Sequence, residues 1–132
     1  MNTVNINSDN FIITKEYETY INNNTGYGFL KIRAYAASEA VPISNLKIEV
    51  STIISNTKYI FYEGLTDNSG LIEEITLPAP KKDPDNLEVP SSTVYQVLAT
   101  KENIKESFDI NIYDGISVIQ TISIVPPMKG MM

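Results

Sequence analysis

The feature that most constrains this chain is the alternation of apolar with polar or charged side chains along short segments. In the stretch YGFLKIRAYAA, the residues Leu30, Ile32 and Ala34 alternate with Lys31 and Arg33. Successive side chains of a strand point to opposite faces, so this pattern predicts a strand with one buried face. Comparable segments follow at residues 46–53, 58–66, 93–101, 107–113 and 116–125. Because no window shows a sustained helical period, the sequence predicts an all-β fold.

Turn residues separate these segments. The run Thr66-Asp67-Asn68-Ser69-Gly70 offers Asx-turn residues followed by a glycine, which predicts a tight connection with a positive φ at Gly70. Ser55-Asn56 predicts a second turn, and Asp114-Gly115 predicts a hairpin between the last two strands.

Prolines predict where strands end. Pro42 lacks an N–H and is expected at an edge or in a connection. The run LIEEITLPAP is predicted as a strand that Pro78 and Pro80 end, because neither can donate to a ladder. Glu73 falls on an inward position of this run, so we expect the open end of a sheet or a bulge there. The following segment, Lys81–Ser92, is a long loop of the kind that is often functional.

At 132 residues the chain has the length of one domain. Residues 1–25 form a polar segment in which Asn10–Ile21 predicts a first strand, and Asn22–Gly26 predicts a turn. Residues 26–127 are expected to form the folded domain and residues 128–132 a tail. Seven to eight short strands separated by turns predict a single antiparallel β-sandwich.

The same alternation predicts the core. Each sheet has one apolar face, which only the opposing sheet can cover. The predicted core residues occupy the inward positions of separate strands: Leu30, Ile32, Leu46, Ile48, Val50, Ile75, Leu77, Val97, Phe108, Ile110, Ile122 and Ile124.

Composition narrows the function. The chain has no cysteine and no histidine, which removes disulfides, thiolate metal sites, serine triads and ordinary zinc sites. No pair of the remaining acidic groups is fixed across a cleft by the sequence, so we expect no enzyme. The net charge is −6 and the largest basic cluster is Lys81-Lys82, which disfavours nucleic acid and anionic lipid as partners. No apolar run approaches the ~20 residues of a membrane span, so no membrane insertion is expected.

Tyrosines and one acidic loop supply the candidate interaction residues. Tyrosine rings stack on sugars or peptides while the hydroxyl bonds, and among the eight tyrosines Tyr35, Tyr59 and Tyr62 are the candidates for such a surface. Sandwiches also use tyrosine to cover core edges. Asp83, Asp85 and Glu88 are spaced as calcium ligands sometimes are, but their loop lacks the glycine of an EF-hand. We therefore expect these carboxylates to be solvated and part of an interaction surface, with no metal and no cofactor.

Three blocks of sequence resemble one family. GFLKIRAYAASEAVPISNLKIEV, at residues 28–50, is similar to the opening of the carboxypeptidase-regulatory-like (transthyretin-like) domains of spore-forming Firmicutes. TDNSGLIEEITLPAP and YDGISVIQTISIVP resemble the turn and the closing segment of the same family. Where that family tends to place Gly-Tyr, this chain reads Lys101-Glu102-Asn103-Ile104. The resemblance covers residues 26–127 and implies a transthyretin-like sandwich, found beside peptidoglycan-acting or spore cortex-lytic modules, with no catalytic residue of its own.

These observations lead to one functional expectation and two alternatives. We expect a non-catalytic accessory or interaction domain of the cell envelope or spore of a low-GC bacterium, which binds a protein or a peptidoglycan-related glycan. The alternatives are a carbohydrate-binding module that uses exposed tyrosines, and a structural subunit of a surface or phage-like assembly whose edge strands pair. The amino terminus, MNTVNINSDNFIITKEY, lacks the features of a signal peptide, so we expect a location in the cytoplasm (mother cell or forespore) or on the spore.

Overall fold

The computed structural model describes residues 2–36, 41–85 and 91–124. Over this part of the chain it contains nine strands and one helix. In chain order the elements are β1 (Asn2–Asn5), α1 (Lys15–Asn23), β2 (Gly26–Ala36), β3 (Val41–Pro42), β4 (Lys47–Ile54), β5 (Thr57–Leu65), β6 (Ile75–Ala79), β7 (Ser92–Lys101), β8 (Ile104–Tyr113) and β9 (Ser117–Ile124).

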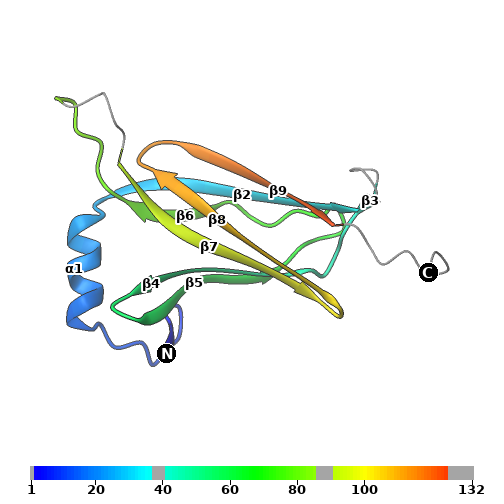
Figure 1. Ribbon diagram of the computed structural model, residues 1–132, viewed down its shortest axis with the longest axis horizontal. Helices are drawn as coiled ribbons and strands as arrows, with labels where there is room; N and C mark the ends of the chain where they lie inside the picture. Colours follow the sequence, from blue (N-terminus) through cyan, green and yellow to red (C-terminus); the bar gives the residue numbers. More distant parts are fainter. Residues whose placement is uncertain (1, 37–40, 86–90, 125–132) are drawn as a thin grey trace.

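The strands form two sheets that pack together, so the predicted all-β sandwich is confirmed (Figure 1). The first sheet has five strands in the order β1-β5-β4-β7-β8. In the second, β6 and β3 follow one another along one edge of β2, and β9 pairs with the other edge. The predicted antiparallel arrangement of seven to eight strands is wrong in part. The described residues form nine strands, and both sheets are mixed, because β1 pairs with β5 and β9 pairs with β2 in parallel, while the other pairs are antiparallel.

The predicted core is confirmed. Phe108 is half buried and packs against the core cluster, and the other predicted core residues are all buried within it. Burial of a Leu or Ile side chain contributes about 1.5–3 kcal/mol, so these apolar residues supply the main stabilisation of the sandwich. Two large side chains outside the predicted core set, Tyr59 and Tyr95, are also fully buried, and alternation places Tyr95 on the same face as the core residue Val97.

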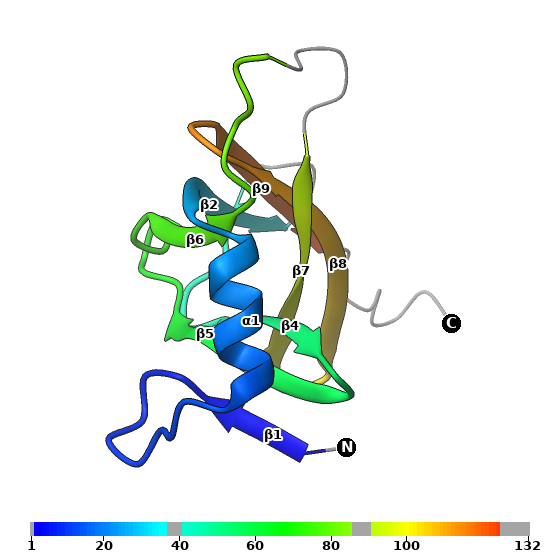
Figure 2. The same ribbon diagram turned by 90° about the vertical axis from the view of Figure 1, so that its left-hand side faces the viewer.

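The predicted strand at Asn10–Ile21 is wrong, because its residues 15–21 belong to helix α1. Thr14 caps the helix by accepting the N–H of Tyr17 at 3.2 Å, and two acidic residues lie in the first turn, where the helix dipole favours them. Tyr17 and Tyr20 are three residues apart, so they share one side of the helix and pack against the core. Figure 2 shows α1 lying across one end of the sandwich.

Two turn predictions have different outcomes. Gly70 has a φ of 75°, which confirms the positive φ predicted from its turn. Asp114-Gly115 does form a turn, with a φ of 77° at Gly115, but the hairpin is wrong because β9 pairs with β2 and leaves the sheet of β8. The turn is held by β2 itself: Gly115 N–H donates to the Tyr27 carbonyl at 2.8 Å.

Of the proline predictions, the one for Pro42 is confirmed and the one for Pro78 is wrong. Pro42 lies in the two-residue strand β3 at the edge of its sheet, as expected. Pro78 does not end its strand, since β6 runs from Ile75 to Ala79 and pairs Pro78 with Tyr27. Glu73 is exposed and precedes β6, so neither a buried carboxylate nor a compensating bulge arises.

Candidate interaction surface

The three candidate tyrosines do not form one surface. Tyr59 is 1% exposed, its hydroxyl lies 2.7 Å from the Thr14 hydroxyl, and its ring stacks on that of Tyr17. Its assignment to a binding surface is therefore wrong. Tyr62 is half buried. The pairing register of β4 and β5 shifts after Val50, and Tyr62 is paired with Val50, so its side chain lies on the same inward face as the buried Val50 side chain. Tyr35 remains half exposed on the outer face of β2.

The acidic loop is partly described. Asp83 and Asp85 are exposed, and Asp85 N–H donates to the Asp83 carboxylate at 2.9 Å in a local turn. Glu88 lies outside the described residues. Among the residues that the structure describes, no group of three or more acidic side chains is placed to hold a metal ion.

The tyrosines with the most perturbed pKa values belong to an aromatic cluster under α1. Tyr17 packs edge-on against Phe11 and lies beside Tyr20 and Phe61, and Phe61 packs edge-on against Tyr95. Burial raises the pKa of Tyr17, Tyr20 and Tyr95 above the ordinary value of 10.0. The Tyr20 hydroxyl bonds that of Tyr95, so these groups are mutually satisfied inside the protein. They stay protonated at neutral pH and hold the helix against the sandwich.

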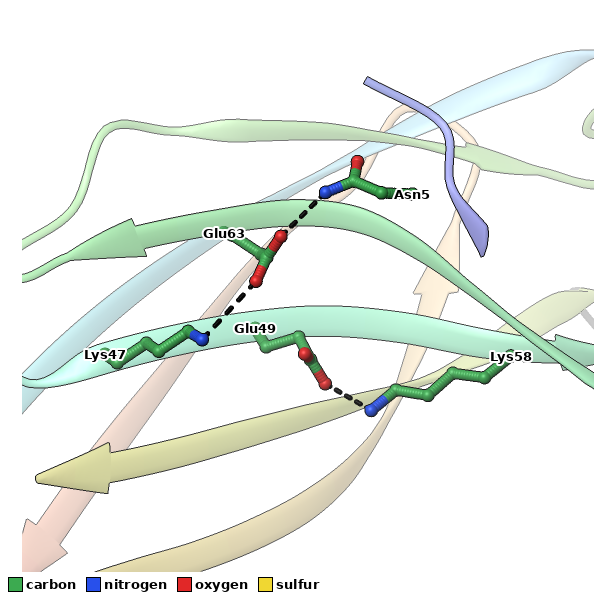
Figure 3. A network of polar contacts seen from close by, with 5 residues as sticks. All are labelled: Asn5, Lys47, Glu49, Lys58 and Glu63. Atoms are coloured by element: carbon green, nitrogen blue, oxygen red, sulfur yellow. Dashed lines mark hydrogen bonds and ion pairs between the residues drawn. The ribbon is translucent and has the colours of Figure 1, made fainter. Parts of the chain in front are cut away.

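The outer face of the five-stranded sheet is occupied by its own charges (Figure 3). Glu63 accepts from Asn5 at 2.7 Å and lies 3.5 Å from the Lys47 ammonium, which links β1, β5 and β4. Beside it, Glu49 pairs with Lys58, and both side chains are largely buried. Among the described residues, the Lys58 ammonium is the partner of the buried Oε2 of Glu49 and balances its charge. These groups stabilise the sheet by linking β1, β5 and β4.

The outer face of the other sheet is different, and we call it the β2–β9 face. It consists of the outward side chains of the two strands: Tyr27, Phe29, Lys31, Arg33 and Tyr35 from β2, and Ser117, Ile119, Thr121 and Ser123 from β9. Ile119 is 59% exposed beside Lys31. Arg33 lies over the ring of Tyr35 at 5.8 Å, and its Nη2 donates to the Thr121 hydroxyl at 3.4 Å. The face therefore presents exposed apolar, aromatic and cationic groups together.

A shallow hollow lies on this face, between β2 and the segment that leads into β6. It has a volume of about 160 Å³ and is lined by Lys31, Ile32, Arg33, Leu71, Ile72, Glu74 and Ile119. Lys31 and Glu74 form an exposed ion pair of 3.8 Å at its rim. A typical ligand pocket is larger, about 300–1,000 Å³, so the hollow suits one side chain of a partner better than a whole cofactor.

Three connections gather at the end of the sandwich where β2 begins. Asp114 accepts the N–H of Tyr27 at 3.1 Å and the N–H of Lys82 at 2.9 Å. It thereby ties the start of the predicted loop Lys81–Ser92 to the first residues of β2. These backbone hydrogen bonds, and then the charges of Lys81 and Lys82, lower the pKa of Asp114 below 3.8. The turn predicted at Asn22–Gly26 is wrong in part, because Asn22 and Asn23 belong to α1 and Gly26 already belongs to β2.

Sequence reasoning missed the β2–β9 face as a site although it placed Arg33 and Tyr35 outward. The missing information was the position of β9: only its parallel pairing with β2 puts Ile119 beside Lys31 and Thr121 beside Arg33. The available signal was the run SVIQTISI, which alternates without any charged residue.

The comparisons bear on the fold. No family model matches the chain, and no curated protein matches it. Among solved structures the chain is similar to "The Bacillus anthracis TIE protein", with 18% identity and a TM-score of 0.53. The match covers 76% of this chain and 16% of that one, so this chain corresponds to a small part of the longer protein. At this identity the likeness shows the fold alone. In the described residues no helix has the length and apolar character needed to cross a membrane.

Proposed function

We propose that this chain is a non-catalytic interaction domain of the cell envelope or spore of a low-GC bacterium. The observation that carries the proposal is the β2–β9 face, where Ile119 is exposed near Lys31 and Arg33, and where Arg33 lies over the ring of Tyr35. Exposed apolar groups with a polar rim are typical of binding surfaces, and arginine and tyrosine are enriched at the centres of protein interfaces.

The titratable groups support the non-catalytic part of the proposal. A general acid or base needs a pKa near the working pH and a position in a cleft. Glu16 and Asp114 have lowered pKa values because they accept hydrogen bonds, so each is a poor proton donor at neutral pH. Tyr20 and Tyr95 have raised pKa values, but they lie under α1 and bond each other.

The setting in an envelope or spore rests on the resemblance to carboxypeptidase-regulatory-like domains and gains some support from a structural neighbour in a Bacillus protein. That neighbour is much longer than this chain, which suits a module that works beside others. A protein partner is favoured over a glycan. Tyr27 and Tyr35 lie near opposite ends of β2, about 26 Å apart at ~3.3 Å per residue, so Arg33 and the exposed Ile119 form the middle of the face, a composition that suits a protein interface.

An incubation with purified cortex and vegetative peptidoglycan tests the non-catalytic claim. The proposal expects that the chain alone releases no muropeptides, even at the protein concentrations used for enzymes and after prolonged incubation. Release that disappears when one of the chain's carboxylates is replaced by its amide contradicts the proposal. A known peptidoglycan hydrolase added to a parallel sample serves as the control that the substrate is digestible.

A further inference from the structure

The edges of the two sheets are not equally protected. Unpaired edges invite further strands, and proteins protect them with short strands, prolines or charges. In the described part of the chain, β1 has four residues, β3 has two and includes Pro42, and β6 includes Pro78. β8 carries Lys105, Glu106 and Asp109. β9 is eight residues long and contains neither a charge nor a proline.

Within residues 2–36, 41–85 and 91–124, β9 pairs with β2 on one side and with no strand on the other. Phe29 N–H donates to the Ile116 carbonyl at 3.0 Å, and Phe29 is opposite Ser117 in the parallel register. In a parallel ladder this pattern directs residues 116, 118, 120, 122 and 124 toward β2. The N–H and C=O groups of Ser117, Ile119, Thr121 and Ser123 then point away from the sheet. In agreement, the Thr121 carbonyl accepts a hydrogen bond from the side-chain amide of Gln120 at 3.0 Å, where a neighbouring strand would otherwise donate.

The side chains beside this edge indicate which residue types a docking strand has next to Ile119 and next to Thr121. Ile119 is exposed on the outer face, so a side chain beside it on a new strand is favoured if it is apolar. Thr121 is small, and the Arg33 guanidinium already lies against its hydroxyl. A carboxylate on the new strand next to Thr121 can therefore reach Arg33 across the threonine. The Arg33 cation of β2, which lies behind the uncharged β9, thus complements an acidic residue on the new strand.

We propose that the free edge of β9 binds an extended segment of a partner protein by strand addition, with an apolar side chain beside Ile119 and an acidic one beside Thr121. This inference deepens the proposed function and rests on it. The two recognised residues are two positions apart, since alternate residues of a strand share a face. Main-chain hydrogen bonds supply affinity, and the apolar and acidic positions supply specificity.

A second copy of the chain fits this edge less well. Two β9 strands related by a twofold axis pair antiparallel and present the same residues to each other. Because β9 contains no acidic residue, such a pair offers no counter-charge to Arg33. Each chain also has a net charge of −6, which opposes association of copies.

Peptide binding tests the inference. The probes are two labelled, terminally blocked peptides, TVTITETV and VTETITVT, because a free edge accepts a strand in either direction. We expect one of them to bind the wild-type protein, and its Glu-to-Lys version to bind at least about threefold more weakly. Methylation of alternate peptide nitrogens provides a backbone control: methylation on one set abolishes binding, and methylation on the other set is tolerated.

Protein variants locate the site. Ile119→Lys places a charge on the edge and should abolish binding, and Arg33→Glu should reverse the preference in favour of the Lys peptide. Lys105→Glu, on the other sheet, is the matched charge reversal and should leave binding unchanged. Circular dichroism confirms that each variant is folded.

Equal affinity for the Glu and Lys peptides, or binding that survives Ile119→Lys, overturns the inference. So does an absence of peptide binding, including the case in which sedimentation shows a dimer that Ile119→Lys dissociates, since the occupant is then a second copy. Such failures leave the proposed function standing if the wild-type protein still captures a partner from an envelope extract and the double variant Arg33→Glu with Ile119→Lys does not.

Discussion

The hydroxyl of Tyr95 donates to the carbonyl oxygen of Pro78 at 2.5 Å, and this bond crosses from β7 in one sheet to β6 in the other. The same hydroxyl meets that of Tyr20 on α1. One buried side chain thus joins both sheets and the helix. It explains why a β-sandwich tolerates a tyrosine at a fully buried position.

Tyr95→Phe should lower the free energy of unfolding by about 1–3 kcal/mol, because it leaves buried polar groups on Pro78 and Tyr20 without their partner. Urea unfolding measures the change. Tyr27→Phe is the control, since the Tyr27 side chain is 55% exposed, and should change stability by less than about 0.5 kcal/mol. Equal stabilities for the two variants would contradict the role given to Tyr95.

Gly70→Ala and Gly115→Ala separate backbone strain from steric contact. Both glycines have a positive φ, of 75° and 77°, so each alanine should cost about 1–2 kcal/mol for its backbone conformation. A Cβ on Gly70 would also lie 2.3 Å from the Ala34 carbonyl oxygen, whereas one on Gly115 would meet nothing within 4 Å. Thermal unfolding should therefore show a larger loss for Gly70→Ala. The opposite order would refute this account of the turn.

Thr14→Ala should destabilise the protein by about 0.5–2 kcal/mol, because it removes the N-cap of α1. It also removes the hydroxyl that bonds Tyr59 in the core. Thr19→Ala, on the exposed side of the same helix, should be close to neutral. Denaturant unfolding of the pair, with far-ultraviolet circular dichroism for helix content, checks the result. A Thr14→Ala variant as stable as the wild type would speak against the cap.

The Asp114 contacts should depend on pH. The pKa of Asp114 in the folded protein lies below its ordinary value of 3.8, so its hydrogen bonds contribute fully above about pH 4. They are lost as the pH falls through the lowered pKa. Hydrogen exchange at the amides of Tyr27 and Lys82, corrected for intrinsic rates, should therefore accelerate when the pH falls below the lowered pKa of Asp114. Asp114→Ala should show the fast exchange at neutral pH as well, and protection in that variant equal to wild type would contradict the assignment.

Much of the sandwich follows from local sequence. Alternation identifies the inward residues of β2, β4 and β7 because each of these strands has one solvent-exposed and one buried face. The positive φ of Gly70 is predictable from local sequence too, since a short turn with the sequence Asp-Asn-Ser-Gly needs one residue at positive φ.

Other features depend on contacts between distant segments. The segment of α1 is rich in Tyr, Thr and Ile, which favour strands, and the helix is decided by its cap and by the core that Tyr17 and Tyr20 cover. Tyr62 is a candidate surface residue from the sequence, but a register shift between β4 and β5 turns it toward the core. The neighbour of β9 is likewise set by pairing across the chain, and the β2–β9 face does not exist without it.

Capture of an envelope partner tests the central claim most directly. Immobilised wild-type protein, the double variant Arg33→Glu with Ile119→Lys, and the double variant Lys105→Glu with Val94→Lys are exposed to the same envelope and spore-coat extract. The two double variants carry the same charge changes on opposite sheets, so nonspecific charge effects are equal. The account predicts that a partner bound by the wild type is retained by the Lys105 and Val94 variant and lost by the Arg33 and Ile119 variant. Retention of every bound protein by both variants would contradict the β2–β9 face as the interaction surface.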